Sequence, residues 1–198
     1  MTEVRTRLLQ ALSRGNGASS DFDLNPDIVL PADRTLRPAG VLVAVEMVAN
    51  LPHIVLTKRA SHLKHHPGQI AFPGGKQDEG DEDVTAAALR EAREEIGLPC
   101  ENVELLGQLP SHETVTSFRV TPVVGLITAP FEDRPEEGEV DEVFRVPLDH
   151  VLKNAHFSIQ ARRWRGQKRH YYTVPFGPYY IWGATARILR GLAERMET

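Results

Sequence analysis

The chain has 198 residues, of which 41% are hydrophobic, and a formal net charge of −4. This is enough for one domain with a real core, and the acidic balance argues against a protein that binds nucleic acid mainly through its overall charge. The single cysteine, Cys100, excludes an internal disulfide framework, and the lack of a long apolar run or signal-peptide core predicts a cytoplasmic protein without membrane contact.

The N-terminal part predicts a helix and then an extended segment. Val4, Leu8 and Leu12 recur at helical spacing within residues 3–13. From residue 15 to residue 39 the composition turns to Gly, Ser, Asp, Asn and Pro, which disfavour long regular structure. We therefore expect a short amphipathic helix followed by an extended wrapping segment.

Two strands are expected next. Residues 40–48 are almost wholly apolar and rich in β-branched side chains, as in a strand buried on both faces. We expect residues 51–53 to turn the chain and residues 54–58 to form the hairpin partner. That strand ends at Arg59, so this positive charge should lie at the rim of the sheet.

The loop at residues 61–68 is polar. His62 and His66 stand four residues apart, which raises the alternative of a transition-metal site. No cysteine or carboxylate companion lies nearby in the sequence, so we favour a loop that contacts anions.

Residues 72–98 combine a glycine turn, an acidic loop and a helix. The turn Phe72-Pro73-Gly74-Gly75 lets the backbone come close to a ligand. Asp81 or Asp83 can cap the helix, and Gly97 ends it. The helix carries one apolar stripe, formed by Val84, Ala88, Ala92 and Ile96.

The charge pattern of this helix is unusual. Glu91, Glu94 and Glu95 lie close together beside the apolar stripe, and Glu91 precedes Glu95 by four residues, which is a repulsive spacing. Arg90 can reach Glu94 and offset part of the repulsion. Three carboxylates on one edge suit a hard divalent cation such as Mg²⁺ or Mn²⁺, and a solvated acidic face is the alternative.

The remaining elements are predicted in alternation. Strands are expected at residues 103–109 and 118–127, and Pro122 places the second at an edge or a bulge. The loop between them either closes over a ligand or is a plain surface loop. An acidic segment then leads to the remaining expected elements, which are a strand at 143–146, a helix at 148–153, a hairpin of 157–164 with 168–174, and a helix at 184–195.

The hairpin is basic and aromatic. We interpret its charges as a tip that blocks edge pairing, with phosphate steering and nucleic-acid binding as alternatives. The residues concerned are Arg162, Arg163, Trp164, Arg165, Lys168, Arg169, Tyr171 and Tyr172.

The block from Arg90 to Leu98, with Gly75 before it, resembles the Nudix box. In that family the pattern begins with a glycine, five residues of any type and a glutamate. Seven further residues separate this glutamate from an Arg-Glu pair, which is followed by an apolar residue, a residue of any type and a Glu-Glu pair. This chain has one additional residue before Arg90, so either Asp81 keeps the glycine spacing or Glu82 keeps the arginine spacing.

A second motif resembles the signature of the coenzyme A pyrophosphatase branch of Nudix hydrolases. It comprises Val55-Leu56-Thr57-Lys58-Arg59-Ala60, Lys64, Gly68 and Phe72-Pro73-Gly74-Gly75. That branch also tends to carry the additional residue in the box. The resemblance implies that the loop contacts coenzyme A, with Arg59, Lys64 and Gly68 as substrate-binding residues, although lysine cannot bind a phosphate in the bidentate way that arginine can.

The resemblance also implies a fold and a site. The fold would be α/β (α+β), a mixed β-sheet sandwiched between α-helices, in a single Nudix domain over 1–198 with residues 1–39 wrapping a catalytic core at 40–198. Glu91, Glu94, Glu95 and the Gly75 carbonyl would hold Mg²⁺ or Mn²⁺, and Arg90 would orient a carboxylate. Glu91, Glu94 or a late carboxylate would activate the water. The candidates for the late carboxylate are Glu139 and Glu142.

The implied reaction is hydrolysis of coenzyme A to 3′,5′-ADP and 4′-phosphopantetheine. A Nudix hydrolase of ADP-ribose, NADH or a nucleoside triphosphate is the alternative, and a binding module without turnover is a third. The intact acidic trio speaks against the third. The expected partner is a small nucleotide, with neither nucleic acid nor membrane, and the oligomeric state stays open with a homodimer among the expectations.

Overall fold

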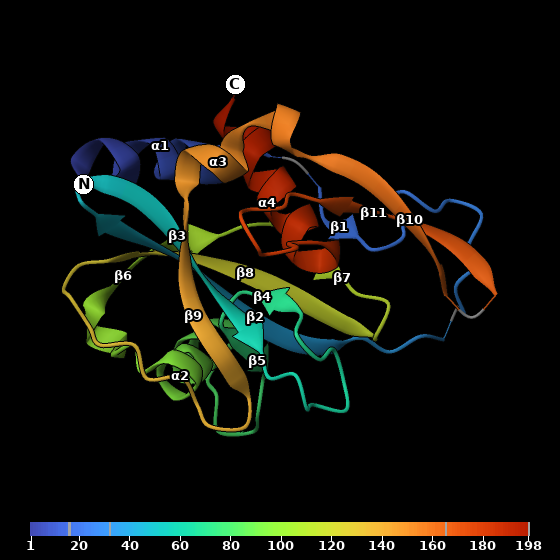
Figure 1. The fold of residues 1–198 in the computed structure, drawn as a ribbon, viewed down its shortest axis with the longest axis horizontal. Coiled ribbons are helices and arrows are strands. Elements are labelled where there is room, and N and C mark those ends of the chain that lie inside the picture. The colour runs from blue at the N-terminus through green and yellow to red at the C-terminus, as the bar shows by residue number, and fades with distance from the viewer. Residues whose placement is uncertain (16, 32, 165, 198) are drawn as a thin grey trace.

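Figure 1 shows the fold in a computed structural model of the chain, which describes residues 1–15, 17–31, 33–164 and 166–197. A large mixed sheet forms the middle layer, and helices cover both of its faces. The expected class, α/β (α+β) with a mixed β-sheet sandwiched between α-helices, is confirmed. No helix within the described ranges is long and apolar enough to cross a membrane.

The long elements lie within three residues of their predicted bounds, whereas the short strands β1, β4, β5 and β7 have no counterpart in the sequence prediction. The helices are α1 Thr2–Ser13, α2 Val84–Ile96, α3 Leu148–Leu152 and α4 Gly183–Met196. The strands of the main sheet are β1 Ser19–Ser20, β2 Arg37–Val48, β3 Leu51–Arg59, β4 Ile70–Ala71, β5 Gly74–Lys76, β6 Val103–Gln108, β7 His112–Glu113, β8 Phe118–Ile127 and β9 Val140–Pro147. A separate hairpin consists of β10 Ser158–Trp164 and β11 Gln167–Thr173.

Strand β2 is the centre of the sheet. It runs parallel to β8 and antiparallel to β3, and β5 pairs with its first residues. Beyond β3 lie β4 and β9, and beyond β8 lie β6, β7 and β1. The pairing of β5 ties the glycine turn directly to the central strand.

Both faces of β2 are buried, as predicted. Leu42 and Ala44 belong to the cluster under α2, whereas Val43 and Val45 belong to the larger cluster that contains α1, α3 and α4. All four side chains are fully buried. Side chains of a strand alternate between faces, so this one strand contributes to both layers of the core. Figure 1 shows α2 on one side of the sheet and α1, α3 and α4 on the other.

The predicted turn at residues 51–53 is wrong. The chain reverses at Ala49 and Asn50, which have positive φ angles of 49° and 64°. Leu51 and Pro52 already belong to β3 and pair with β2. A two-residue turn with positive φ at both positions matches the twist of a hairpin, and asparagine tolerates this conformation. Pro52 therefore does not mark the turn.

The predicted edge or bulge position of Pro122 is also wrong. Strand β8 lies inside the sheet, where Pro122 is opposite Val41 of β2. On its other side the partner changes from β7, opposite Val120, to β6, opposite Val123. The Pro122 carbonyl accepts a hydrogen bond from the Leu109 N–H at 2.9 Å. A residue without an N–H is tolerated at this gap between two partner strands.

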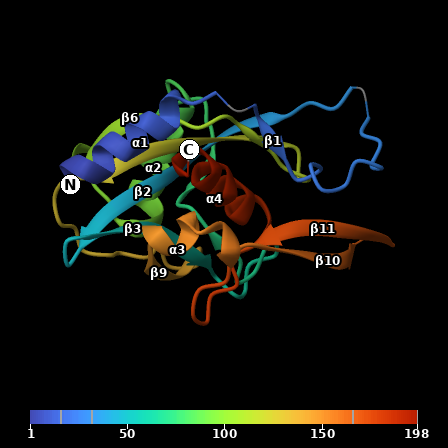
Figure 2. The same cartoon turned by 90° about the horizontal axis from the view of Figure 1, so that it is seen from above.

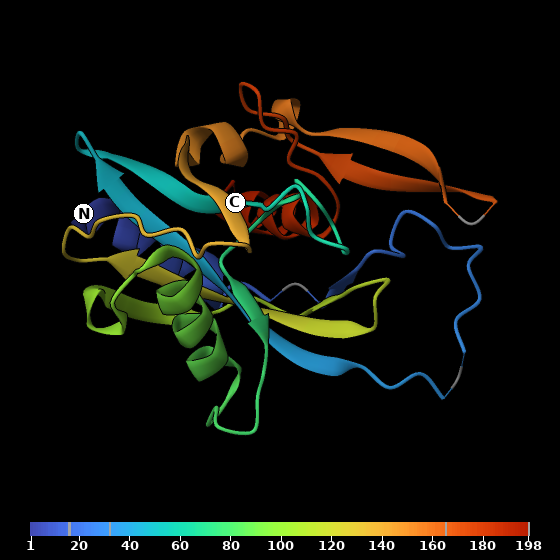
Figure 3. The ribbon, with the colours of Figure 1, turned by 60° about the horizontal axis from the view of Figure 1, so that its bottom comes forward.

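The N-terminal segment contacts the hairpin, which projects at one end in Figures 2 and 3. Asn25 Nδ2 donates to the His170 carbonyl of β11 at 2.9 Å, and the His170 N–H donates to Asn25 Oδ1 at 2.8 Å. Further along the sheet, buried His112 hydrogen-bonds Ser19 and Asp21. The segment thus joins the hairpin to the main sheet. Arg165, which was expected in the hairpin connection, lies outside the described residues.

Gly40 sets how closely α2 approaches the sheet. A Cβ atom at Gly40 would lie 1.9 Å from the carbonyl oxygen of Val84, the first residue of α2. Neither backbone can give way without moving the helix or the central strand. The helix therefore packs where it does because residue 40 has no side chain.

We expect Gly40→Ala to lower the free energy of unfolding by about 1–3 kcal/mol or more, because the added methyl group overpacks a backbone contact. Urea denaturation measures this change. Gly80→Ala is the matched control, since a Cβ at Gly80 meets no atom within 4 Å. Equal denaturation midpoints for the two variants would contradict the assignment.

Candidate active site

Helix α2 carries a buried carboxylate on the face that packs against the sheet. Glu95 is only 4% exposed, and its Oε2 atom accepts a hydrogen bond from the Gly74 N–H at 3.1 Å. Asp83 caps the start of the helix by accepting hydrogen bonds from the N–H groups of Thr85 and Ala86 at 2.7 and 2.9 Å. Gly97, with a φ of 74°, ends it. The cap and the stop fix the register that turns Glu95 inward.

Burial makes Glu95 difficult to ionise. It raises the pKa of Glu95 to about 7, and repulsion from Glu91 and Glu139 acts in the same direction, while the Gly74 N–H and Arg59 oppose it. A carboxylic acid with this pKa sits near the balance between its two protonation states at neutral pH.

Glu91 lies against the glycine turn. A Cβ atom at Gly75 would be 2.4 Å from Glu91 Oε1, so the absence of a side chain at residue 75 makes room for the carboxylate. Burial also raises the pKa of Glu91, with repulsion from Glu94 and Glu139 in the same direction, whereas Arg90 opposes the shift. The structure thus brings together Gly75, Glu91 and Glu95, three of the predicted metal ligands.

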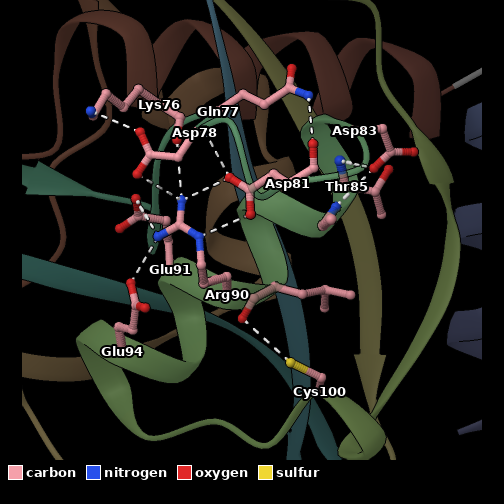
Figure 4. Close-up of polar contacts among 12 residues, drawn as sticks. Lys76, Gln77, Asp78, Asp81, Asp83, Thr85, Arg90, Glu91, Glu94 and Cys100 are labelled. Carbon is pink, nitrogen blue, oxygen red and sulfur yellow. Dashed lines mark hydrogen bonds and ion pairs between the residues drawn. The ribbon is translucent and has the colours of Figure 1, made fainter.

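Arg90 joins the acidic loop to the helix (Figure 4). Its Nε and Nη2 atoms donate to the two carboxylate oxygens of Asp81, each at 2.9 Å. Its Nη1 atom donates to Glu94 at 2.8 Å and to Glu91 at 3.1 Å. Hydrogen bonds from Arg90 lower the pKa of Asp81. Asp81 and Glu82 were the two alternatives for the first acidic position. Asp81 is the one that contacts Arg90, whereas the side chain of Glu82 is exposed.

The acidic loop is closed by its own hydrogen bonds. The Asp78 N–H donates to Asp81 Oδ2 at 2.8 Å, and Gln77 Nε2 donates to the Asp81 carbonyl at 3.3 Å. Cys100 lies away from this cluster, with its thiol near the Leu89 carbonyl (Figure 4). The loop thus presents Asp81 to Arg90 in a fixed orientation.

The two late carboxylates lie in different places. Glu139 precedes β9 and is close enough to α2 to raise the pKa of Glu91 and of Glu95 by repulsion. Its main-chain carbonyl accepts a hydrogen bond from the Ala60 N–H at 2.8 Å. Glu142 instead accepts a hydrogen bond from the Tyr179 hydroxyl. Glu139, and not Glu142, therefore belongs to the carboxylate cluster of α2.

The donor chemistry of this cluster fits a divalent cation. Carboxylate oxygens are the ligands that Mg²⁺ and Mn²⁺ prefer, and α2 places the carboxylates of the partly buried Glu91 and the buried Glu95 near each other. Within the described part of the chain, no three His, Cys, Asp or Glu side chains enclose a metal ion as they stand. Glu91 and Glu94 accept hydrogen bonds from Arg90, and Glu95 accepts one from Gly74. A bound cation would replace these donors as the partner of the carboxylates.

The predicted substrate-binding residues border two adjoining hollows. Arg59 and Gly74 line a cavity of about 290 Å³. Lys64 and Gly68 line a wider cleft of about 960 Å³. The loop that carries them is closed at its base, since the Gly68 N–H donates to the Arg59 carbonyl at 3.1 Å. These residues lie beside the carboxylate cluster and not within it.

The sequence missed the opposite wall of these hollows. Arg162, Arg169 and Trp182 line both of them, whereas Arg163 and Lys168 line neither. This position favours the alternative of phosphate steering for Arg162 and Arg169, while the interpretation of the hairpin charges as a block to edge pairing stays a prediction. The basic and aromatic composition was the available signal, but it does not reveal which side chains face inward.

Comparisons with known proteins identify the family of this chain. The family model of the NUDIX domain matches residues 37–165. A relative named "Uncharacterized Nudix hydrolase NudL" from Enterobacter sp. (strain 638) is 43% identical over 157 residues, which cover 79% of this chain and 81% of the relative. The protein of the same name from Citrobacter koseri is 42% identical over the same coverage.

Solved structures share the fold at low identity. A MutT/nudix family protein from Enterococcus faecalis superposes with a TM-score of 0.55 at 17% identity, covering 87% of this chain and 66% of that one. The NUDIX domain of Shewanella oneidensis NrtR, complexed with ADP ribose, gives a TM-score of 0.53 at 16% identity, covering 86% and 95%.

We expect Glu95→Gln to stabilise the protein in metal-free buffer above pH 7, by on the order of 3 kcal/mol, because it removes a buried charge. The folded protein binds a proton on Glu95 below pH about 7 and the unfolded chain only below about 4.5, so wild-type stability falls as pH rises between these values. The advantage of the variant should therefore vanish below pH 4.5.

Urea denaturation in EDTA across this pH range measures the difference. Glu82→Gln, at an exposed position of the acidic loop, is the control and should match the wild type throughout. A Glu95→Gln effect that is constant with pH would contradict the raised pKa.

Proposed function

The chain belongs to the Nudix hydrolase family, and on that premise we propose that it hydrolyses the pyrophosphate bond of coenzyme A or its derivatives. The products would be 3′,5′-ADP and 4′-phosphopantetheine or its acyl form. The observation that carries the proposal is the position of the loop that bears the second motif. Arg59 borders the same cavity as Gly74, whose N–H group binds Glu95, and Lys64 and Gly68 border the adjoining cleft.

The family ordinarily needs divalent metal ions, and we propose Mg²⁺ or Mn²⁺ here. Glu91, Glu94 and Glu95, with the Gly75 carbonyl, would hold the cation. When bound, it would neutralise charge that develops on the phosphate oxygens. Support comes from the donor set, because Glu91 and Glu95 are held close together at a cost in charge repulsion.

Arg90 acts on the carboxylates and not on the substrate. Charge-assisted hydrogen bonds to Glu91, Glu94 and Asp81 fix the side chains of the helix relative to the acidic loop. Arg59 and Lys64 supply positive charge for the substrate phosphates from the facing loop. Lys64 is a mobile point charge, so it compensates phosphate charge without imposing bidentate geometry.

We propose Glu139 as the base that accepts a proton from the attacking water. Its side chain takes no hydrogen bond from the described residues, whereas Glu91 and Glu94 accept hydrogen bonds from Arg90. A carboxylate without such a donor has both oxygens available to accept a hydrogen bond from water. Glu91 and Glu94 remain the alternatives for this role.

A second candidate substrate is ADP-ribose. The NUDIX domain of Shewanella oneidensis NrtR shares the fold of this chain and is complexed with ADP ribose. This substrate would use the same carboxylates and leave the loop at residues 60–68 without a specific role.

The proposal extends to the localisation, domain organisation and oligomeric state of the protein. We propose a cytoplasmic enzyme with one domain over residues 1–198 that acts on a small nucleotide. A homodimer stays a prediction.

A substrate panel with Mg²⁺ or Mn²⁺ tests the proposed specificity. We expect the highest kcat/KM for coenzyme A and its acyl esters, compared with ADP-ribose, NADH and deoxynucleoside triphosphates, because only the former match the second motif. Phosphate-containing products resolved by chromatography give the rates. A clear preference for ADP-ribose would overturn the substrate and leave the Nudix chemistry in place.

Removal of the proposed base should slow the chemical step. We expect Glu139→Gln to lower kcat by about 10²- to 10⁴-fold with little change in KM, since general-base catalysis contributes this much. Glu142→Gln is the matched comparison three residues further along the chain, because Glu142 is already bound by Tyr179, and its kcat should fall far less. An unchanged kcat for Glu139→Gln would assign the role to Glu91 or Glu94.

A further inference from the structure

One cavity is lined both by the glycine turn before α2 and by the hairpin. The 290 Å³ cavity is bordered by Arg59 and Gly74, whose N–H group binds Glu95, and also by Arg162, Arg169 and Trp182. A ligand that fills it contacts both groups of residues. The hairpin is therefore placed to bind a part of the substrate that lies away from the bond being hydrolysed.

The two arginines are held in an unfavourable pairing. Arg162 of β10 lies directly opposite Arg169 of β11, so their side chains share one face of the hairpin. Like charges at opposed positions destabilise an antiparallel pair. Both side chains line the cavity, so two positive charges lie close together at its wall despite their mutual repulsion.

The guanidinium group of Arg162 is positioned by the ring of Trp182. The group stacks on this ring at 4.1 Å, and no carboxylate of the described residues pairs with it. A guanidinium that stacks through its face keeps the N–H groups on its edge for an anion. The carboxylates that border the hollows are engaged elsewhere, Asp21 with His112 and Glu142 with Tyr179.

The N-terminal segment fixes this wall. Asn25 binds both backbone groups of His170, the neighbour of Arg169 in β11, and His170 pairs with Ala161 beside Arg162. Asn25 is a positioning residue for the hairpin. Its side chain is 7% exposed and does not itself reach the cavity.

We propose that Arg162 and Arg169 form a subsite for a terminal phosphate monoester, the 3′-phosphate of the nucleotide end of the substrate. This inference rests on the proposed function, because coenzyme A carries such a group in addition to its pyrophosphate. A phosphate monoester bears up to two negative charges, which match the two opposed guanidinium groups. The subsite gives the enzyme a means to distinguish coenzyme A from its 3′-dephospho form.

Equilibrium binding of product analogues tests the subsite without turnover. In metal-free buffer with EDTA, we expect the wild type to bind 3′,5′-ADP about tenfold or more tightly than 5′-AMP, as for a charge-assisted hydrogen bond. Arg162→Gln should remove this preference and leave 5′-AMP binding unchanged. Arg162→Lys should restore part of it, because lysine keeps the charge without the fork of donors.

Arg163→Gln is the matched control. It removes the same charge from the next residue of β10, which lines neither hollow, and should keep the full preference for 3′,5′-ADP. Equal affinities of the wild type for the two nucleotides, or equal losses in Arg162→Gln and Arg163→Gln, would overturn the subsite. Circular dichroism confirms that each variant is folded.

Turnover separates this inference from the proposed function. If coenzyme A is hydrolysed but the ratio of kcat/KM for coenzyme A and 3′-dephospho-coenzyme A is the same in wild type and Arg162→Gln, the subsite is wrong and the function stands. If coenzyme A is not hydrolysed but 3′,5′-ADP binding depends on Arg162, the subsite stands and the function is wrong.

Discussion

Helix α2 approaches strands β2 and β5 at two points where no side chain fits. At Gly40 the limit is the carbonyl oxygen of Val84, and at Gly75 it is the carboxylate of Glu91. The short distance between helix and sheet is what buries Glu95 on a face that otherwise packs alanines and an isoleucine. The electrostatics of the candidate site therefore follow from packing, because the raised pKa of Glu95 comes first from burial.

Repulsion between Glu91 and Glu95 at the i, i+4 spacing destabilises this helix by a few tenths of a kcal/mol, and a nearby cation offsets that cost. Arg90 supplies that charge within the protein by contacting Glu91, Glu94 and Asp81 at once. The loop before the helix divides its aspartates between two tasks, with Asp83 as the cap and Asp81 as the partner of Arg90.

Much of this arrangement could be predicted because its signals are local. The caps and stripe of α2 and the apolar run of β2 depend on neighbours in the chain, and both elements were found. The turn was misplaced because Pro52 is a stronger local signal than Asn50, and Pro122 was misjudged because a gap between two partner strands is a tertiary feature. The shared cavity of Gly74 and Arg162 could not be predicted, since it depends on where the hairpin docks.

The net charge of the chain does not describe the local charge that an anionic substrate would encounter at the hollows. The chain is acidic overall, yet Arg59, Lys64 and Arg162 all border the hollows beside the carboxylate cluster. Cationic walls can attract a pyrophosphate, but they do not remove the repulsion from Glu91 and Glu95 at the end of the path. That repulsion is the physical reason to expect a divalent cation here, and it makes binding of cation and of substrate mutually dependent. Protons and a divalent cation would compete for these carboxylates, because either one removes the negative charge that repels a phosphate.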